Sequence, residues 1–136
     1  MTGGAGFLGS NIVNELLNSG KEVVIFDNGF RQDFTNIEGI KGKFSLIKGD
    51  VTIKEDWERL PKDFDMVYHL AAINGTKYFY EIPEKVLTVN VNGTMNFVNW
   101  LQTSNVKRFF FSSSSEVYGF PKVFPTPETE ELSIPE

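Results

Sequence analysis

Cysteine is absent from the chain, and only one histidine occurs among its 136 residues. Without cysteine the chain can form neither disulfide bonds nor thiolate-ligated metal sites, and a single imidazole argues against a zinc site. The sequence also lacks any apolar run near the roughly 18 residues of a membrane-spanning helix, and it shows no signal-peptide pattern. We therefore expect a cytoplasmic protein with no bound metal and no membrane partner.

Basic residues are in the minority, because 13 Lys and Arg stand against 18 Asp and Glu, for a net charge of −5. Nucleic-acid-binding domains usually present a basic face to the phosphate backbone, so we expect no nucleic-acid partner. Apolar residues make up 40% of the chain, which is ordinary for a globular protein. A chain of this length has room for one domain with a sizeable core.

Three glycines open the chain. Gly3, Gly6 and Gly9 are spaced three apart, and an apolar helical pattern follows at once. Such a loop makes a tight turn, lets the backbone approach a pyrophosphate and presents helix N-terminal N–H groups to it, so the spacing predicts a dinucleotide site. A loop of this kind normally follows a β-strand. Only Met1 and Thr2 precede it here, so we expect the first strand to be reduced to these two residues.

Helical and extended patterns alternate along the rest of the chain. Predicted strands cover residues 22–27, 43–49, 65–72 and 106–113, and predicted helices cover residues 7–19, 53–60 and 83–104. Gly20 closes the first helix, and the proline-containing segment after Gly119 is predicted to be irregular. Strands that alternate with helices indicate an α/β fold with a doubly wound parallel sheet.

The predicted helix over residues 83–104 is apolar over more than half of its circumference. Because a helix on a sheet needs an apolar stripe of only ~100°, the excess indicates a second buried surface, against either another helix or another subunit. Asn90 falls inside the apolar arc. Its amide needs hydrogen-bond partners there, and these are either a neighbouring strand or loop, or a bound cofactor.

Asp27 ends the first predicted strand, 18 residues beyond Gly9. An acidic residue at this place hydrogen-bonds the adenosine ribose hydroxyls. Its charge would repel a 2′-phosphate by about 4 kcal/mol at ~4 Å, so we expect NAD rather than NADP, although the nearby Arg31 could soften this preference. A turn-forming aspartate before Asn28 and Gly29 is the structural alternative.

Four serines, Ser112 to Ser115, follow a run of three phenylalanines that is predicted to be buried. They would stand at the carboxyl end of a parallel strand, where ligands bind in open α/β sheets. A capping or turn role for each hydroxyl is the alternative. His69 lies on an otherwise apolar strand and is predicted to be a packed, hydrogen-bonded histidine rather than a catalytic base.

Six short motifs occur in order along the chain: TGGAGFLG at 2–9, FDN at 26–28, GDV at 49–51, HLAA at 69–72, NVNGT at 90–94 and SSSSEVYG at 112–119. Together they resemble the extended short-chain dehydrogenases/reductases, specifically the NAD-dependent nucleotide-sugar epimerases, dehydratases and decarboxylases. The resemblance covers nearly the whole chain. It implies a Rossmann-type NAD-binding domain over residues 1–136 that is truncated at both ends, with the first strand essentially missing and the C-terminal part and substrate domain absent.

The resemblance also implies roles for particular residues. It places Asn90 near the cofactor, Ser114 on the sugar hydroxyl that is oxidised, and Glu116 in acid–base or substrate-orienting chemistry. Glu116 is typical of the dehydratase and decarboxylase branches, whereas Ser115 replaces the aspartate of some 4,6-dehydratases. The remaining implied cofactor contacts are Gly3, Gly6, Phe7 and Leu8 for the pyrophosphate, Asp27 and Asn28 for the ribose, Asp50 and Val51 for the adenine, and Leu70, Ala71, Ala72, Ser112 and Ser113 toward the nicotinamide.

The family's catalytic Tyr-x-x-x-Lys pair is missing from the chain. Tyr118 and Lys122 have the right spacing, but Pro121 lies between them and prevents one helical face from carrying both. Because the first strand is reduced and the catalytic pair is missing, the chain is expected to bind NAD weakly and to be inactive. The intact protein is expected to form a homodimer through the helix around 83–104.

The resemblance implies an epimerase or dehydratase that transiently oxidises a nucleotide-sugar carbon, C4, with NAD+. A nucleotide-sugar decarboxylase of the same family is the first alternative. A non-catalytic NAD-binding sensor domain and an NAD(P)H-dependent reductase of a non-sugar substrate are the others.

Overall fold

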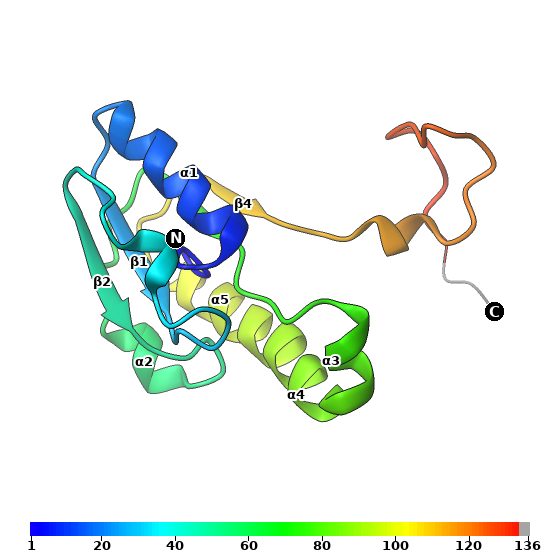
Figure 1. Ribbon diagram of the computed structural model, residues 1–136, viewed down its shortest axis with the longest axis horizontal. Helices are drawn as coiled ribbons and strands as arrows, with labels where there is room; N and C mark the ends of the chain where they lie inside the picture. The colour runs from blue at the N-terminus through cyan, green and yellow to red at the C-terminus, as the bar shows by residue number, and fades with distance from the viewer. Residues whose placement is uncertain (134–136) are drawn as a thin grey trace.

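Helices and short strands alternate along the protein, whose computed structural model describes residues 1–133 (Figure 1). Two 3-10 turns, η1 (Thr35–Ile37) and η3 (Ser115–Tyr118), accompany them. In chain order the other elements are α1 (Phe7–Asn18), β1 (Val23–Asp27), β2 (Phe44–Lys48), α2 (Lys54–Glu58), β3 (Val67–His69), α3 (Thr76–Glu81), α4 (Pro83–Leu87), the π-helical turn η2 (Thr88–Asn92), α5 (Gly93–Gln102) and β4 (Phe109–Phe111).

Met1 and Thr2 lie at the centre of a parallel sheet. Strand β1 pairs with β2, and β3 pairs with β4. Thr2 forms parallel bridges to Phe26 in β1 and to His69 in β3. The order across the sheet is therefore β2, β1, Met1–Thr2, β3, β4. This arrangement confirms both the predicted parallel α/β fold and the prediction that the first strand is reduced to two residues.

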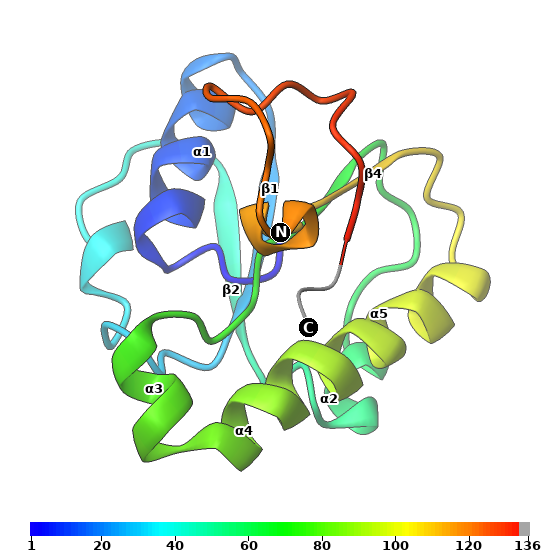
Figure 2. The same cartoon turned by 90° about the vertical axis from the view of Figure 1, so that its right-hand side faces the viewer.

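Helix α1 lies on one side of the strands, and the α4–α5 helix lies on the other (Figure 2). Val13 and Leu17 of α1 share a buried cluster with Ile25 of β1. The helix ends as predicted, because Gly20 adopts a positive φ of 73° and its N–H donates to the Leu17 carbonyl at 2.9 Å. This conformation costs glycine little.

A larger cluster fills the space between the sheet and helices α2 and α5. Trp57 of α2 packs edge-on against Phe26 with ring centroids 5.2 Å apart, and it also contacts Phe97 and Trp100 of α5. Apolar burial of this kind is the main stabilising contribution to the fold. The core therefore lies mostly on the α5 side of the sheet.

The long predicted helix over 83–104 differs in detail from the structure. It runs as α4, η2 and α5 and ends at Gln102, with the π-helical turn η2 in its middle. Periodicity cannot reveal such a turn because it inserts only a local widening into the helix. Gly93 begins α5 where a Cβ would lie 2.7 Å from the Val51 side chain, so this position admits no larger residue without movement.

Two sequence expectations about neighbouring segments are wrong. Residues 76–81, which lie outside the predicted helices and strands, form α3; none of its residues is fully buried, so it carries no apolar stripe to detect. The Phe109–Phe111 run was expected to be buried, yet these side chains are 45–56% exposed. Their strand β4 is the sheet edge and has a paired neighbour on one side only.

After β4 the chain leaves the body of the protein, and residues 112–133 extend away from it (Figure 1). As predicted, the described residues after Gly119 contain no strand or α-helix, and the 3-10 turn η3 precedes them. Among the helices of residues 1–133, none combines the length and apolar composition that crossing a bilayer demands.

Candidate nucleotide-binding site

The glycine loop brings the N-terminus of α1 against the end of β3. Gly3 adopts a positive φ of 67°, and a Cβ there would lie 2.7 Å from the Ala71 nitrogen. A Cβ on Gly9 would lie 2.1 Å from the Gly3 carbonyl oxygen. The turn itself is closed by the Gly6 N–H, which donates to the Gly3 carbonyl at 3.1 Å. Glycine is therefore required at position 3 by packing and by conformation, and at position 9 by packing alone.

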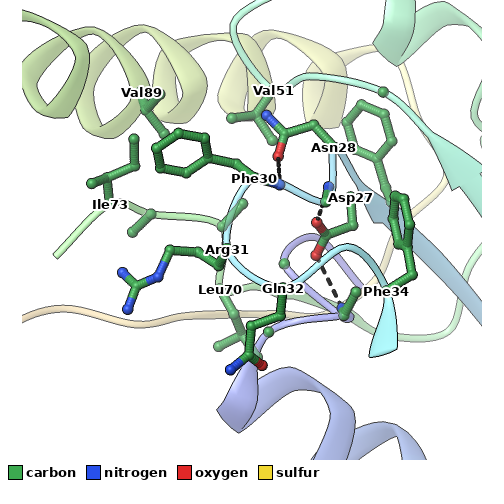
Figure 3. Close-up of a pocket in the computed structure, with 18 of the residues that line it drawn as sticks. Asp27, Asn28, Phe30, Arg31, Gln32, Phe34, Val51, Leu70, Ile73 and Val89 are labelled. Atoms are coloured by element: carbon green, nitrogen blue, oxygen red, sulfur yellow. Dashed lines mark hydrogen bonds between the residues drawn. The ribbon is translucent and has the colours of Figure 1, made fainter. Parts of the chain in front are cut away.

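Asp27 joins two loops at the carboxyl end of β1. One carboxylate oxygen accepts from the Ala5 N–H at 3.0 Å, and the other accepts from the Gly29 N–H at 2.9 Å. The second bond is the turn-forming contact that was the structural alternative for this residue. The same carboxylate faces a pocket (Figure 3), so the turn role and a ligand-facing position coexist.

A hydrogen-bond network fixes the loop after β2. Asn28 donates to Asp50 at 2.9 Å, and Thr52 donates to the same carboxylate through its N–H at 2.8 Å and its hydroxyl at 2.7 Å. Burial alone would raise the pKa of Asp50. The hydrogen bonds from Thr52 and Asn28 and the charge of Lys85 outweigh burial and lower the pKa of Asp50 below its ordinary value of 3.8. Asp50 is therefore an anion at neutral pH.

The Thr2 hydroxyl ties together the end of β3. Its oxygen lies 3.2 Å from the N–H groups of Leu70 and Ala71, and 2.9 Å from Nδ1 of His69. Since the oxygen accepts both N–H bonds, its own hydrogen is left for His69, whose Nδ1 accepts it. Burial lowers the pKa of His69 to about 4, and the positive amino terminus acts in the same direction. His69 is thus the packed, hydrogen-bonded histidine that the sequence predicts.

Asn90 holds the next stretch of this loop through its side chain. Its amide nitrogen donates to the Ile73 carbonyl at 2.9 Å, and its amide oxygen accepts from the Ile73 N–H at 2.9 Å. This pair of bonds is the tie to a neighbouring loop that the sequence analysis offered as one alternative. A direct contact between Asn90 and a cofactor stays a prediction.

These segments enclose a pocket of about 100 Å³ at the carboxyl ends of the strands. Eight of the expected cofactor residues line it: Gly3, Gly6, Asp27, Asn28, Val51, Leu70, Ala71 and Ala72. Phe7, Leu8, Asp50 and Asn90 lie outside its lining. Phe7, Asp50 and Asn90 are each next in sequence to a lining residue, and Leu8 follows Phe7. Sequence reasoning missed several members of the lining, among them Phe30, Gln32, Phe34, Ile73, Lys85 and Val89. Their one available signal was position in the chain. Phe30, Gln32 and Phe34 follow Asp27, Ile73 follows the Leu70–Ala72 strand end, and Lys85 and Val89 belong to the α4–η2 helix.

The expected catalytic segment does not reach this pocket. The Ser112 hydroxyl donates to the His69 carbonyl at 3.3 Å, whereas Ser113, Ser114 and Glu116 are exposed and none of the four lines the pocket. The Ser114 hydroxyl caps η3 by accepting from the Glu116 N–H at 3.3 Å, which is the capping alternative. Roles for these residues toward a nicotinamide or a sugar stay predictions.

Tyr118 and Lys122 do not share a helical face. The turn η3 ends at Tyr118, and Gly119 follows with a positive φ of 57°. This geometry confirms the reason for rejecting them as a catalytic pair.

Comparison with known proteins gives a consistent result. The family model described as "NAD dependent epimerase/dehydratase family" matches residues 1–135. UDP-glucuronic acid decarboxylase 1 of Arabidopsis thaliana is 36% identical over 131 residues, which cover 95% of this chain and 29% of that protein. UDP-glucose 4-epimerase of Haemophilus influenzae is 34% identical over 138 residues, which cover 97% of this chain and 41% of that protein. The chain thus spans well under half the length of these relatives.

Solved structures resemble the fold closely. An epimerase from Methanothermobacter thermautotrophicus superposes with a TM-score of 0.84 at 35% identity, covering 98% of this chain and 40% of that one. UDP-glucose 4-epimerase from Bifidobacterium longum, solved in complex with NAD+ and UDP, superposes with a TM-score of 0.84 at 30% identity, covering 97% of this chain and 41% of that one.

Proposed function

The chain belongs to the NAD dependent epimerase/dehydratase family, and from this premise we propose that residues 1–136 form the NAD-binding part of an enzyme that acts on a nucleotide sugar. One observation carries the proposal: the glycine loop, Asp27 and the Leu70–Ala72 strand end converge on a single pocket. Relatives named as UDP-sugar epimerases and decarboxylases support the substrate class.

The residues present fit such a cofactor. Helix α1 carries no acidic residue in its first turn, so its free N–H groups face an anion without competition. The N–H groups of Phe7 and Leu8 would hold the pyrophosphate. The Gly6 N–H closes the turn on the Gly3 carbonyl, and Gly3 and Gly6 would let the backbone approach the anion closely. Asp27 and Asn28 would bind the adenosine ribose, and the loop of Asp50 and Val51 would meet the adenine edge.

The chemistry that NAD supplies when bound is reversible hydride transfer with a sugar carbon, for which we propose C4. In this proposal Ser112 and Ser113 lie beside the nicotinamide, and Ser114 orients the sugar hydroxyl that loses its proton. Glu116 then holds or moves a proton next to the ketone. These roles require the segment after β4 to fold back toward the pocket when substrate binds.

Epimerisation or dehydration is the reaction we favour, and decarboxylation is the second candidate. Decarboxylation is supported by the Ser115–Glu116 pair and by the Arabidopsis thaliana relative. A sensor domain would bind NAD without any turnover in the intact protein, and a reductase would consume the cofactor without binding a nucleotide sugar.

Cofactor binding by the purified chain tests the proposal. Titration calorimetry should show binding of NAD and at least tenfold weaker binding of NADP, because the Asp27 carboxylate repels a 2′-phosphate. Asp27→Asn should reduce this preference about tenfold, whereas Asp33→Asn, a matched change in the same loop outside the pocket lining, should leave it unchanged. Absence of NAD binding, or equal wild-type affinity for both cofactors, would contradict the proposal.

We also propose that a second copy of the chain covers the outer face of the α4–α5 helix. Leu87, Val91, Met95 and Val98 are 40–66% exposed and lie four, four and three residues apart, so they form one apolar stripe along the helix. The opposite face of the same helix already packs in the core through Val86, Phe97 and Trp100.

A further inference from the structure

Two cationic side chains line the pocket without forming an ion pair within the described residues. Arg31 and Lys85 both line the pocket. The ion pairs within residues 1–133 all lie elsewhere, between Lys43 and Glu22, Arg59 and Asp56, and Lys77 and Glu81. The charge of Lys85 already acts on Asp50, whose pKa it lowers. In a chain whose net charge is −5, Arg31 is therefore the lining cation that needs a local explanation.

Arg31 links the loop after β1 to the segment between β3 and α3. Its Nη1 donates to the backbone carbonyl of Asn74 at 3.1 Å and to the Asn74 side-chain oxygen at 3.4 Å. Its guanidinium carbon lies 5.0 Å from the ring centre of Tyr78 in α3. Figure 3 shows the guanidinium turned away from Asp27. Arg31, which lines the pocket, thus connects the loop after β1 to the segment after β3.

Aromatic rings hold both cations in place. The Lys85 Nζ lies 3.9 Å from the ring centre of Phe30, and the rings of Phe30 and Tyr78 are 6.1 Å apart. Cation–π contacts of this kind fix a charge without neutralising it. Among its protein contacts, Arg31 uses only Nη1 for hydrogen bonds to described residues. Its Nε and Nη2 therefore remain as the two-pronged donor that suits a phosphate.

Charge in the pocket favours a phosphate between this arginine and the glycine loop. The glycine loop offers only neutral N–H groups. Asp27, the one acidic residue of the lining, has each of its oxygens bound to a backbone N–H. A pyrophosphate brings two negative charges into this site, and only Arg31 and Lys85 of the lining can compensate them.

We propose that Arg31 binds the pyrophosphate of the dinucleotide from the side opposite the glycine loop and so positions the cofactor. The inference rests on the proposed function, which supplies the dinucleotide, and adds a residue that neither the glycine-loop pattern nor the family match assigns.

The test compares phosphate-bearing and phosphate-free ligands on the purified chain. Arg31→Met should raise the Kd for NAD about tenfold, the loss expected for a partly exposed charge-assisted contact. Arg31→Lys should recover part of the lost affinity for NAD, because lysine keeps the positive charge but lacks the two-pronged guanidinium donor. The affinity for adenosine should not change, and the dependence of NAD binding on salt should weaken. Lys77→Met on α3 removes an equal charge outside the pocket and should alter none of these values.

Each other result overturns the inference. Unchanged NAD affinity in Arg31→Met shows that the guanidinium does not touch the cofactor. An equal loss for adenosine assigns Arg31 a role in holding the loop. A loss confined to NADP means that it contacts a 2′-phosphate instead. If the wild-type chain binds neither NAD nor adenosine, the proposed function itself fails. If the wild-type chain binds NAD and Arg31→Met binds it equally well, only the inference about Arg31 fails.

Discussion

His69 shows how one buried side chain controls the end of a strand. Its ring stacks on Phe97 with centroids 4.3 Å apart and on Phe111 at 5.8 Å, and 3% of the residue is exposed. The neutral ring accepts the Thr2 hydroxyl hydrogen and thereby leaves the Thr2 oxygen free for the Leu70 and Ala71 N–H groups. A protonated ring would no longer accept at Nδ1.

Stability should therefore fall at mildly acid pH. Because the folded protein lowers the pKa of His69 from 6.5 to about 4, the contribution is complete above pH 6.5 and is lost as pH falls toward 4. The full loss amounts to about 3 kcal/mol in the free energy of unfolding. Urea unfolding between pH 7.5 and 4 measures it.

His69→Phe is the matched variant for this prediction. It retains a flat ring on Phe97 and removes the titrating group, so its stability should vary less between pH 6.5 and 4. The buried amino group of Met1, whose pKa burial also lowers to about 5, is common to both proteins and largely cancels in the difference. Parallel pH profiles would contradict the prediction.

At the residue scale, the sequence identifies which side chains matter better than it identifies their partners. The position of Asp27 after a strand predicts that it faces a ligand, but its bond to Ala5 depends on how the glycine loop docks. Asn90 must be satisfied because it lies in an apolar arc, yet only the folded chain brings Ile73 to it. The serines after β4 cannot be placed from sequence, because no local pattern specifies where that segment packs.

Among the elements, those with a buried face were predictable from their apolar periodicity. The strands and helices that pack in the core match their predicted positions, with the ends of β3 and β4 shortened by several residues. Helix α3 has no fully buried residue and gave no signal. Within the π-helical turn η2, Val89 lines the pocket and the adjacent Asn90 bonds Ile73, which also lines it. A regular helix, in which neighbouring residues point 100° apart, would not favour this arrangement.

The exposed stripe on α4–α5 gives an element-scale prediction. Sedimentation should show a dimer of the wild-type chain, and Met95→Glu should shift it to monomer, because a charge in the centre of an apolar interface is left unpaired. Ile53→Glu changes a comparably exposed apolar residue on another element and should leave the dimer intact. A wild-type monomer at high concentration would refute this assignment.

The sheet as a whole contains a gap opposite the pocket. A groove of about 1350 Å³ runs between the first residues of β1 and of β3, and Val23, Val24, Val67 and Tyr68 are among its lining residues. Met1 marks the end of this groove, where its amino group donates to the Val24 carbonyl at 2.6 Å. Within residues 1–133, the backbone edges of β1 and β3 thus face each other across this groove without a strand between them.

A short extension before Met1 should fill this groove. Five added residues rich in valine and isoleucine can continue Met1–Thr2 as a strand between β1 and β3. We expect the free energy of unfolding to rise by at least about 2 kcal/mol, since each buried apolar side chain contributes about 1.5–3 kcal/mol. An extension of five glycine and serine residues is the control in thermal melts. Equal melting temperatures for the two would show that no strand forms.

The parallel α/β fold follows from alternating patterns and the glycine loop, and its prediction needed no knowledge of contacts. The pocket, however, is assembled from loops that follow β1, β2 and β3, and its shape depends on side chains such as Phe30 and Arg31 for which the sequence carries no periodic signal. Its location could be foreseen at the carboxyl ends of the strands, but not its full lining.

The parallel bridges that Thr2 forms to β1 and β3 also bear on the order in which the protein folds. The bridge from Thr2 to Phe26 joins residues 24 apart and the bridge from Thr2 to His69 joins residues 67 apart, whereas β1–β2 pairs residues 21 apart and β3–β4 pairs residues 42 apart. Loop closure makes distant parallel pairing slow. We therefore expect the bridge between Thr2 and β3 to close last, so that the ligand pocket, which needs Thr2 in place, appears only in the final kinetic phase of refolding.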